Sequence, residues 1–193
     1  MEKHRHFIVH KPYGYLSQFV YRQLRRKNKK LLGELYDFPE GVMSVGRLDE
    51  DSEGLLCVTT DGVVSAQLRM KDVEKEYFVQ VDGAITDEAI ETLKNGVEIS
   101  IEGKKYQTLP CQAYKLDPAP ETGPRAKKVR SDRHGPSSWI SITISEGKYR
   151  QVRKMTAAVG FPTLRLIRVR IGKIALGDLK VGEVMEVDRF NYK

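Results

Sequence analysis

Apolar residues recur along the chain mainly in short runs, and several of these runs alternate with polar residues as half-buried strands do. Three isoleucines share one face of such a run at 139–145, and the segment 75–81 alternates in the same way. Further apolar runs, bounded by turn-forming residues, predict strands at 7–9, 54–60, 97–101, 104–108 and 163–171. In the last of these the apolar phase changes between Leu166 and Ile167, so we expect a bulge or a bend there.

Two segments, 87–95 and 149–159, have the spacing of helices instead. The first follows Thr86, which suits an N-cap, has two acidic residues in its first turn and ends before Gly96. In the second, apolar residues recur roughly on one face. Helices and strands therefore follow one another in mixed order, and the pattern favours an α+β fold.

The composition is that of a soluble globular protein, with 31% charged and 40% hydrophobic residues. A chain of 193 residues can bury a sizeable core without disulfides, and its two cysteines suit a reducing compartment. The N-terminal apolar run is too short for a signal peptide, and no run approaches the length of a membrane span. We therefore expect a cytoplasmic protein with no membrane partner.

Positive charge is concentrated in two stretches of the chain. Lys and Arg number 33 against 26 Asp and Glu, which gives a net charge of +7. Residues 21–30 carry six cations and residues 147–177 carry eight, and neither stretch contains an acid. The first stretch fits a solvated cationic face equally well, but the cations of the second lie within apolar sequence and need partners. A basic patch on a mildly acidic body indicates a polyanion, with nucleic acid ahead of an anionic membrane or an acidic protein.

The segment 117–138 differs from the rest in composition, because it holds four of the eight prolines. It also carries five cations, Arg125, Lys127, Lys128, Arg130 and Arg133. This composition predicts a flexible surface insert. The sequence leaves open whether the insert touches RNA or is a solvated loop.

Several familiar sites can be excluded from the sequence. The acidic cluster at 49–54 lacks the ligands that a calcium loop requires at its fifth and twelfth positions. Gly41 and Gly46 have the spacing of a phosphate-binding loop, but Arg47 and Leu48 replace the Lys and the Ser or Thr that follow it. The four histidines have no companions at metal-ligand spacing, and no Ser or Cys lies in a nucleophile elbow.

The tetrapeptide Gly46-Arg47-Leu48-Asp49 lies just before a predicted strand. A carboxylate beside an arginine is ionised at neutral pH, and an ionised carboxylate can act as a nucleophile at a sugar carbon. A surface salt bridge fits the same residues, and spacing alone favours that simpler interpretation.

Four separated blocks make the sequence similar to a known family. They are Lys11-Pro12-x-Gly14, Gly46-Arg47-Leu48-Asp49-x-x-Ser52-x-Gly54-Leu55-Leu56, Lys75-x-Tyr77, and the run from Glu146 to Met155 with its continuation at 164–172. In this order they resemble the RsuA-like rRNA pseudouridine synthases over nearly the whole chain. The pattern at 11–19 is most similar to members that act on the large ribosomal subunit. Ser52 stands where Thr is usual and Lys148 where Arg is usual, and because each keeps the hydroxyl or the charge we expect activity to be retained.

The resemblance implies an isomerase that converts a specific uridine in rRNA to pseudouridine, and 23S rRNA is the expected substrate. It implies no metal or other cofactor. Asp49 would act as the nucleophile at the sugar, or as the base that leads to a glycal intermediate, and Arg153 would pair with it. Tyr77 would stack on the flipped uracil, a contact worth about 1–3 kcal/mol. Arg47 would hold the gap left in the RNA, and Val152 would pack against the uracil or wall the pocket. Further substrate-binding roles are predicted for Lys75, Lys148, Arg150 and Lys11.

The same resemblance predicts a long, bent, mostly antiparallel sheet flanked by helices, with the active-site cleft across its middle. Two sub-lobes around the cleft would form one catalytic domain, 1–193, without the small RNA-binding domain that precedes it in many relatives, and we expect a monomer. Other classes stay open: a non-catalytic RNA-binding module for ribosome assembly, a synthase for another RNA such as tRNA, and a glycosidase-like enzyme for a free nucleoside. The last is disfavoured because no motif places a second catalytic carboxylate.

Overall fold

The computed structural model describes residues 3–20, 28–70, 73–130 and 132–192. Most of the basic stretch 21–30, expected either to contact a polyanion or to form a solvated cationic face, lies outside these residues. The chain divides into two compact units. Unit 1 comprises Met1–Val73, Gly123–Lys127 and Arg168–Lys193, and unit 2 comprises Glu74–Thr122 and Lys128–Ile167.

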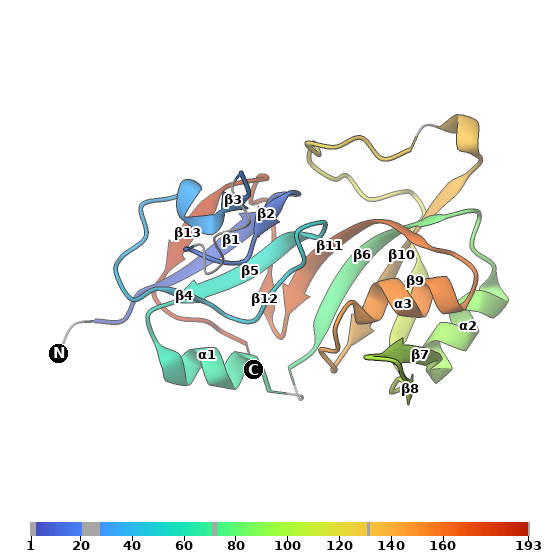
Figure 1. Ribbon diagram of the computed structural model, residues 1–193, viewed down its shortest axis with the longest axis horizontal. Coiled ribbons are helices and arrows are strands. Elements are labelled where there is room, and N and C mark those ends of the chain that lie inside the picture. Colours follow the sequence, from blue (N-terminus) through green and yellow to red (C-terminus); the bar gives the residue numbers. More distant parts are fainter. Residues whose placement is uncertain (1–2, 21–27, 71–72, 131, 193) are drawn as a thin grey trace. The chain divides into compact units, whose positions relative to one another are not determined.

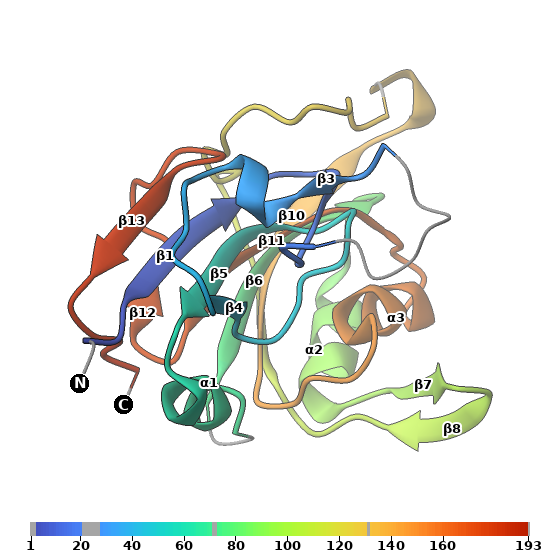
Figure 2. The same ribbon diagram turned by 60° about the vertical axis from the view of Figure 1, so that its left-hand side comes forward.

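In unit 1, strand β1 (His6–Lys11) lies between β5 (Glu53–Thr59) and β13 (Val184–Val187) and runs antiparallel to both (Figure 2). Every residue of β1 and β5 is buried, which makes this pair the centre of the unit. Shorter elements complete the unit: β2 (Tyr15–Leu16), β3 (Lys30–Leu31), the 3-10 turn η1 (Leu32–Glu34), β4 (Met43–Ser44) and β12 (Ile174–Ala175).

The dipeptide Asp61-Gly62, which by itself favours a turn, begins helix α1 (Gly62–Leu68). The Asp61 carboxylate accepts hydrogen bonds from the backbone N–H groups of Val63 at 2.8 Å and Val64 at 3.1 Å. These bonds satisfy donors that the first helical turn leaves open. They also favour the charged carboxylate, Val64 most of all, and hold the pKa of Asp61 below its ordinary value.

In unit 2, strand β10 (Ser137–Ile144) lies between β6 (Lys75–Asp82) and β9 (Gln112–Lys115), antiparallel to both (Figure 1). Helices α2 (Asp87–Asn95) and α3 (Gln151–Ala158) pack against these strands, and β7 (Glu98–Ile101) and β8 (Lys104–Gln107) form a hairpin. The three isoleucines of β10 are buried in one core with residues of both helices. The predicted alternation at 139–145 therefore marks the face that the helices cover.

The ends of the two predicted helices differ in how well local sequence determines them. Helix α2 has the predicted bounds, because the Thr86 hydroxyl accepts from the Ala89 N–H at 3.2 Å and Gly96 ends the helix at a φ of +87°. Helix α3 begins at Gln151, later than predicted, because Arg150 has a left-handed backbone with a φ of +53°. No helix in the described ranges is long and apolar enough to cross a membrane.

Strand β11 (Thr163–Ile171) is continuous over its nine residues. The division between the units falls inside it, since Ile167 belongs to unit 2 and Arg168 to unit 1. This is one residue beyond the position where the apolar phase of the sequence changes. The change of phase therefore marks the passage of the strand from one core to the other.

The insert 117–138 is irregular from Asp117 to Arg130 and enters β10 at Ser137. The Arg165 guanidinium donates to the Thr122 hydroxyl at 2.9 Å, and that of Arg130 pairs with Asp82. The flexibility expected from its composition stays a prediction, but described residues near both ends of the insert have side-chain contacts within unit 2.

Candidate active site

Asp49 lies in the loop between β4 and β5. The side chain of Ser17 holds this loop through two hydrogen bonds to the backbone of Leu48. The Ser17 hydroxyl accepts from the Leu48 N–H at 3.0 Å and donates to the Leu48 carbonyl at 2.8 Å. Asp49 closes a turn, because its carbonyl accepts from the Ser52 N–H at 3.0 Å. Leu48 is buried and Asp49 is half-buried, so the loop backbone is held while Asp49 is not fully enclosed.

The loop after β1 is bonded directly to the Asp49 loop. The Gly14 N–H donates to the Glu50 carbonyl at 2.8 Å. The Lys11 ammonium donates to the carbonyls of Ser52 at 2.7 Å and Pro12 at 2.9 Å. The first two sequence blocks of the family are therefore a single structural feature, in which one loop supports the backbone of the other.

Lys11 is completely buried, so its amine supports the loop from beneath and is not presented to a substrate. Burial removes the water that stabilises the ammonium and lowers the pKa of Lys11 to about 8. The negative charges of Glu53, Asp51, Asp49 and Glu50 act in the opposite direction. These contacts indicate a positioning role for Lys11, and its predicted substrate-binding role stays a prediction.

Gly54, at the start of β5, is required by its surroundings. Its φ is +102°, and a Cβ there would lie 2.2 Å from the carbonyl oxygen of Arg168. The Arg168 Nε donates in turn to the Leu55 carbonyl at 2.8 Å. The close backbone approach of β5 and Arg168 fixes the downstream end of the Asp49 loop.

Tyr77 and Val152 occupy the core of unit 2 to different degrees. Tyr77 lies on β6 opposite Ile142 of β10 and is half-buried against the core. Val152, in the first turn of α3, is almost fully buried in that core. Tyr77 is therefore the more exposed of the two, and the predicted contact of each residue with the uracil stays a prediction.

The loop that precedes α3 is fixed by Glu146. Its carboxylate accepts from the Tyr106 hydroxyl, from the Leu109 N–H at 2.9 Å and from the Gln151 amide at 2.7 Å. Burial opposes the negative charge, but these hydrogen bonds outweigh it and hold the pKa of Glu146 below its ordinary value. The Gln151 side chain also accepts from the Lys148 N–H at 3.1 Å, so the turn into α3 is bonded on both sides.

The predicted cationic site residues are distributed over both units. Arg47, in unit 1, is exposed beside Asp49, while Arg150 and Arg153, in unit 2, are half-buried at the start of α3. Lys148 is exposed and lies 4.8 Å from the centre of the Tyr106 ring. Lys75 donates to the Ser145 carbonyl at 3.4 Å. The predicted pairing of Arg153 with Asp49 joins residues of two units and stays a prediction.

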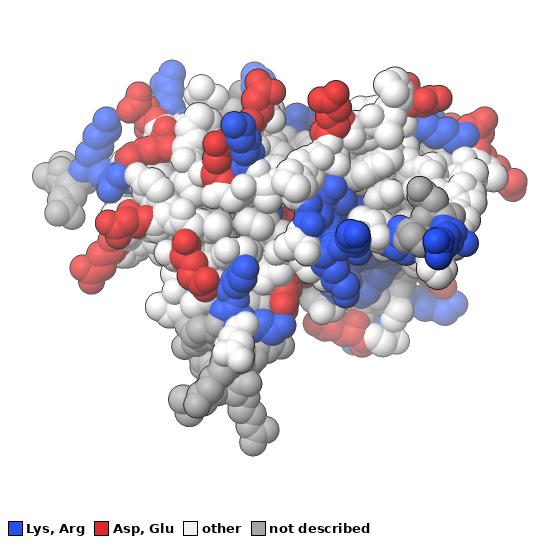
Figure 3. All heavy atoms as spheres, turned by 90° about the horizontal axis from the view of Figure 1, so that it is seen from above, with Lys and Arg blue, Asp and Glu red and all other residues white. Residues whose placement is uncertain are grey.

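Part of the positive charge at 147–177 is structural. Arg165 and Arg168 are buried, and the Arg170 guanidinium donates to the Gly172 carbonyl at 2.8 Å. Figure 3 shows Lys and Arg gathered in places on the face that it draws, with acids elsewhere on the same face. Exposed cations such as Lys148 are therefore better candidates for phosphate contacts than the arginines of β11.

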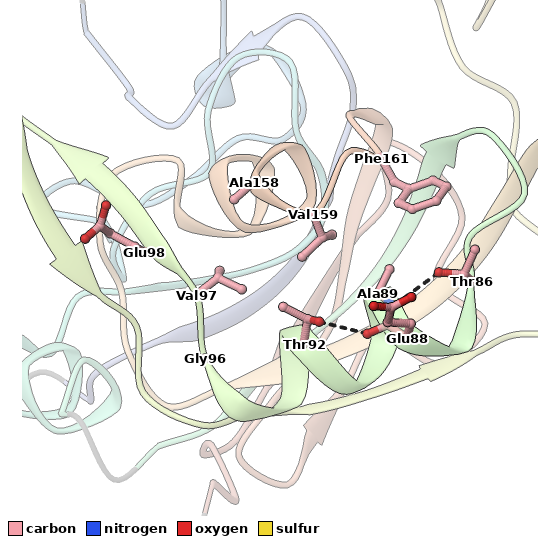
Figure 4. Close-up of a pocket in the computed structure, with 10 residues that line it drawn as sticks. All are labelled: Thr86, Glu88, Ala89, Thr92, Gly96, Val97, Glu98, Ala158, Val159 and Phe161. Carbon is pink, nitrogen blue, oxygen red and sulfur yellow. Dashed lines mark hydrogen bonds between the residues drawn. The ribbon is translucent and has the colours of Figure 1, made fainter.

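The pocket beside α2, the two cysteines and the described acidic and histidine residues add no candidate catalytic group or metal site. A pocket of about 490 Å³ lies beside α2 and the end of α3 (Figure 4). It is lined by Thr86, Glu88, Ala89, Thr92, Gly96, Val97, Glu98, Ala158, Val159 and Phe161, none of them a predicted site residue. Burial raises the pKa of the Cys57 thiol to about 12 and that of Cys111 to about 11, so neither is a nucleophile at neutral pH. Among the described residues, no group of His, Cys, Asp or Glu is arranged to hold a metal ion.

Comparison with protein families matches residues 5–158 to the family described as RNA pseudouridylate synthase. The chain belongs to this family. It is 42% identical over 189 residues to ribosomal large subunit pseudouridine synthase E of Vibrio parahaemolyticus serotype O3:K6 (strain RIMD 2210633), covering 97% of this chain and 75% of that protein. It is 46% identical over 168 residues to the protein of the same name in Xanthomonas axonopodis pv. citri (strain 306), covering 86% and 84%.

A solved structure titled as a crystal structure of pseudouridylate synthase has the same fold. It matches with a TM-score of 0.75 and 26% identity, over 97% of this chain and 71% of that one. The predicted α+β pseudouridine synthase fold is thereby confirmed. As an RNA pseudouridylate synthase, the chain is an isomerase that acts on RNA.

Several positioning residues of this synthase were not predicted from sequence. Ser17 acts on Leu48 across 31 positions, and Glu146 acts on Tyr106 across 40. Glu146 could have been suspected, because an acid beside an otherwise cationic block needs a partner when it is buried. Ser17 lies within the pattern at 11–19, but that pattern does not indicate that its hydroxyl binds the Leu48 backbone.

Proposed function

We propose that this chain converts a specific uridine of large-subunit ribosomal RNA to pseudouridine, and that Asp49 is the residue that reacts at the ribose. The observation that carries the proposal is the fixed backbone around Asp49. Ser17, Gly14 and Lys11 hold the loop from three positions, while Asp49 itself is only half-buried. The relatives named ribosomal large subunit pseudouridine synthase E support the choice of RNA.

The reaction is an internal transfer within one nucleotide. The bond from C1′ to N1 breaks, the uracil turns, and C5 bonds to C1′, while C5 loses a proton and N1 gains one. A carboxylate at Asp49 would either attack C1′ or act as the base that leads to a glycal intermediate. No electrons and no group pass to another molecule, so the residues of the chain and the RNA suffice.

Other side chains would act on the target nucleotide around Asp49. The base must leave its stack, which costs a few kcal/mol, and the exposed Arg47 is available to occupy the gap. The half-buried ring of Tyr77 would stack on the flipped uracil, and Arg153 would pair with Asp49. We expect the enzyme to act as a monomer in the cytoplasm.

Replacement of Asp49 tests this proposal directly. Asp49→Asn and Asp49→Ala should abolish tritium release from rRNA labelled at C5 of uridine, because no carboxylate remains to react. RNA binding should stay within about threefold of wild type. Glu50→Gln is the matched control, since Glu50 lies in the same loop but forms a half-exposed ion pair with Lys29 at 2.6 Å. Exposed pairs contribute about 0–1 kcal/mol, so this variant should remain active.

Retained turnover in the Asp49 variants would refute the assignment of Asp49 as the reacting residue, whereas wild-type protein that binds rRNA without releasing tritium would favour a non-catalytic RNA-binding module. The choice of RNA is tested separately by comparing 23S rRNA with tRNA as substrates for the wild-type protein. Mapping pseudouridines in rRNA from cells with and without the gene should then identify the modified position as the one that disappears.

A further inference from the structure

Five residues of the insert, Gly123–Lys127, belong to unit 1 although the residues on both sides of them belong to unit 2. Gly123 contacts the segment before β13 so closely that a Cβ would lie 2.7 Å from Cγ2 of Val181. This part of the insert therefore packs closely within unit 1, and the composition of the insert alone does not predict that packing.

Arg125 is the centre of this packing. Its guanidinium lies 4.1 Å from the centre of the Tyr13 ring, and its Nε lies 3.4 Å from the Glu53 carboxylate. The Arg125 side chain is only 10% exposed and that of Glu53 is fully buried. A planar guanidinium can stack on an aromatic ring and face a carboxylate at once, which a lysine amine cannot do.

The ion pair differs in kind from the surface pairs of the same unit. Arg5 and Glu186 also pair beside an aromatic ring, that of Phe7, but their side chains are more than 40% exposed. Water can replace either partner there. At Glu53 the loss of Arg125 would leave a buried carboxylate with less compensating charge, and a buried charge must be compensated.

Both partners of Arg125 belong to the segments that hold Asp49. Tyr13 lies between Pro12, whose carbonyl accepts from Lys11, and Gly14, whose N–H donates to Glu50. Glu53 immediately follows Ser52, whose carbonyl also accepts from Lys11. Arg125 thus contacts the loop after β1 at Tyr13 and the residue that follows the Asp49 loop at Glu53. These two segments are also hydrogen-bonded to each other, through Lys11 and Gly14.

We propose that Arg125 is a positioning residue for the reaction, which holds the Asp49 loop in its working conformation from the insert. This inference rests on the proposed function only in taking Asp49 as the reacting group. The insert is then part of the support of the active site, in addition to any contact that its exposed cations make with RNA.

The test compares Arg125→Met, which keeps the length of the side chain and removes the charge, with Arg125→Lys, which keeps the charge and loses the stacking. Arg5→Met is the matched control, because it removes an exposed arginine with the same two kinds of contact. Each protein is assayed for single-turnover tritium release at saturating enzyme, for RNA affinity, for thermal unfolding and for amide hydrogen exchange without RNA.

We expect Arg125→Met to lower the single-turnover rate at least tenfold while the RNA dissociation constant changes less than threefold. Exchange should accelerate in peptides that cover 46–53 and 12–14 more than in peptides from β1. The decrease in the logarithm of the single-turnover rate should be smaller in Arg125→Lys than in Arg125→Met by at least a third. The single-turnover rate of Arg5→Met should stay within twofold of wild type.

A rate within threefold of wild type for Arg125→Met, or a loss confined to RNA affinity, would overturn the inference and make Arg125 at most an RNA contact. Exchange raised evenly through unit 1, with no recovery in Arg125→Lys, would overturn it in favour of a general structural role. If Arg125→Met does not fold, the same criteria apply to Arg125→Lys, whose rate must then fall with affinity unchanged. Inactive wild-type protein would refute the proposed function, whereas the exchange measurement would still decide whether Arg125 holds the loop.

Discussion

Lys11 can keep both of its hydrogen bonds whether or not its amine is protonated, because a neutral amine still carries two N–H donors. Its pKa of about 8 in the folded protein lies below the value of about 10.5 expected for an exposed lysine in the unfolded chain. Between these values the unfolded chain binds more protons than the folded one. The free energy of unfolding should therefore rise with pH over this interval.

This pH dependence can be measured against Lys11→Met. At about 1.4 kcal/mol per pKa unit, the stability of the wild type relative to the variant should increase by up to about 3 kcal/mol from pH 7.5 to 10.5. Urea unfolding at several pH values gives both curves, and other titrating groups cancel in the difference. A difference that is flat or falls with pH would mean that the amine is not desolvated.

Gly46 and Gly54, which lie on either side of Asp49 in the second sequence block, form a matched pair for substitution. Both have positive φ, +69° and +102°, but a Cβ at Gly46 would meet nothing within 4 Å whereas one at Gly54 would collide with the Arg168 backbone. We expect Gly54→Ala to lower the free energy of unfolding by about 3 kcal/mol or more, and Gly46→Ala by about 1 kcal/mol. Equal losses in chemical denaturation would contradict the close approach.

At the scale of elements, helix α1 depends on its cap. Asp61→Ala removes the acceptor for the Val63 and Val64 N–H groups and should lower the free energy of unfolding by about 1 kcal/mol. Asp61→Asn keeps an acceptor oxygen and should lose less. Because the pKa of Asp61 is lowered, the advantage of wild type over Asn should be present above pH 4 and diminish as the pH falls further. Urea titrations at pH 7 and pH 3 measure the difference in free energy of unfolding between wild type and Asp61→Asn. The same difference at both pH values would contradict the prediction.

The elements also show which parts of the fold are legible in the sequence. Helix α2 could be predicted to the residue because Thr86 and Gly96 determine its ends locally. The start of α3 could not, because the left-handed backbone of Arg150 lies in a loop that Glu146 holds through bonds to Tyr106 and Leu109, which are distant in sequence. Asp61-Gly62 was ambiguous for another reason, since the same dipeptide can close a turn or cap a helix.

The site divides in the same way. Asp49, Tyr77 and Arg153 were identified by family motifs, which record chemistry without recording which residues hold it in place. The burial of Lys11, the clamp formed by Ser17 and the contacts of Arg125 depend on chain segments that meet only in the folded protein. Sequence patterns therefore indicate candidate reacting groups but do not indicate the residues that hold them in place.

At the scale of the whole molecule, the charge distribution predicts how RNA binding depends on salt. Exposed cations such as Arg47 and Lys148 would displace counterions from the RNA backbone. The affinity for rRNA should fall at least tenfold between 50 and 200 mM salt, with a linear relation between the logarithms of affinity and salt concentration. Filter binding or anisotropy measures the slope, and a flat response would show that phosphate contacts contribute little.

The order of the two units along the chain has a consequence for biosynthesis. All residues of unit 2 precede Arg168, whereas unit 1 needs β13 near the end of the chain to pair with β1 near its beginning. A ribosome making this protein therefore releases every residue of unit 2 before the last segment of unit 1. Strand β1, which leads into the loop bonded to the Asp49 loop, therefore gains its neighbour β13 only after every residue of unit 2 has been made.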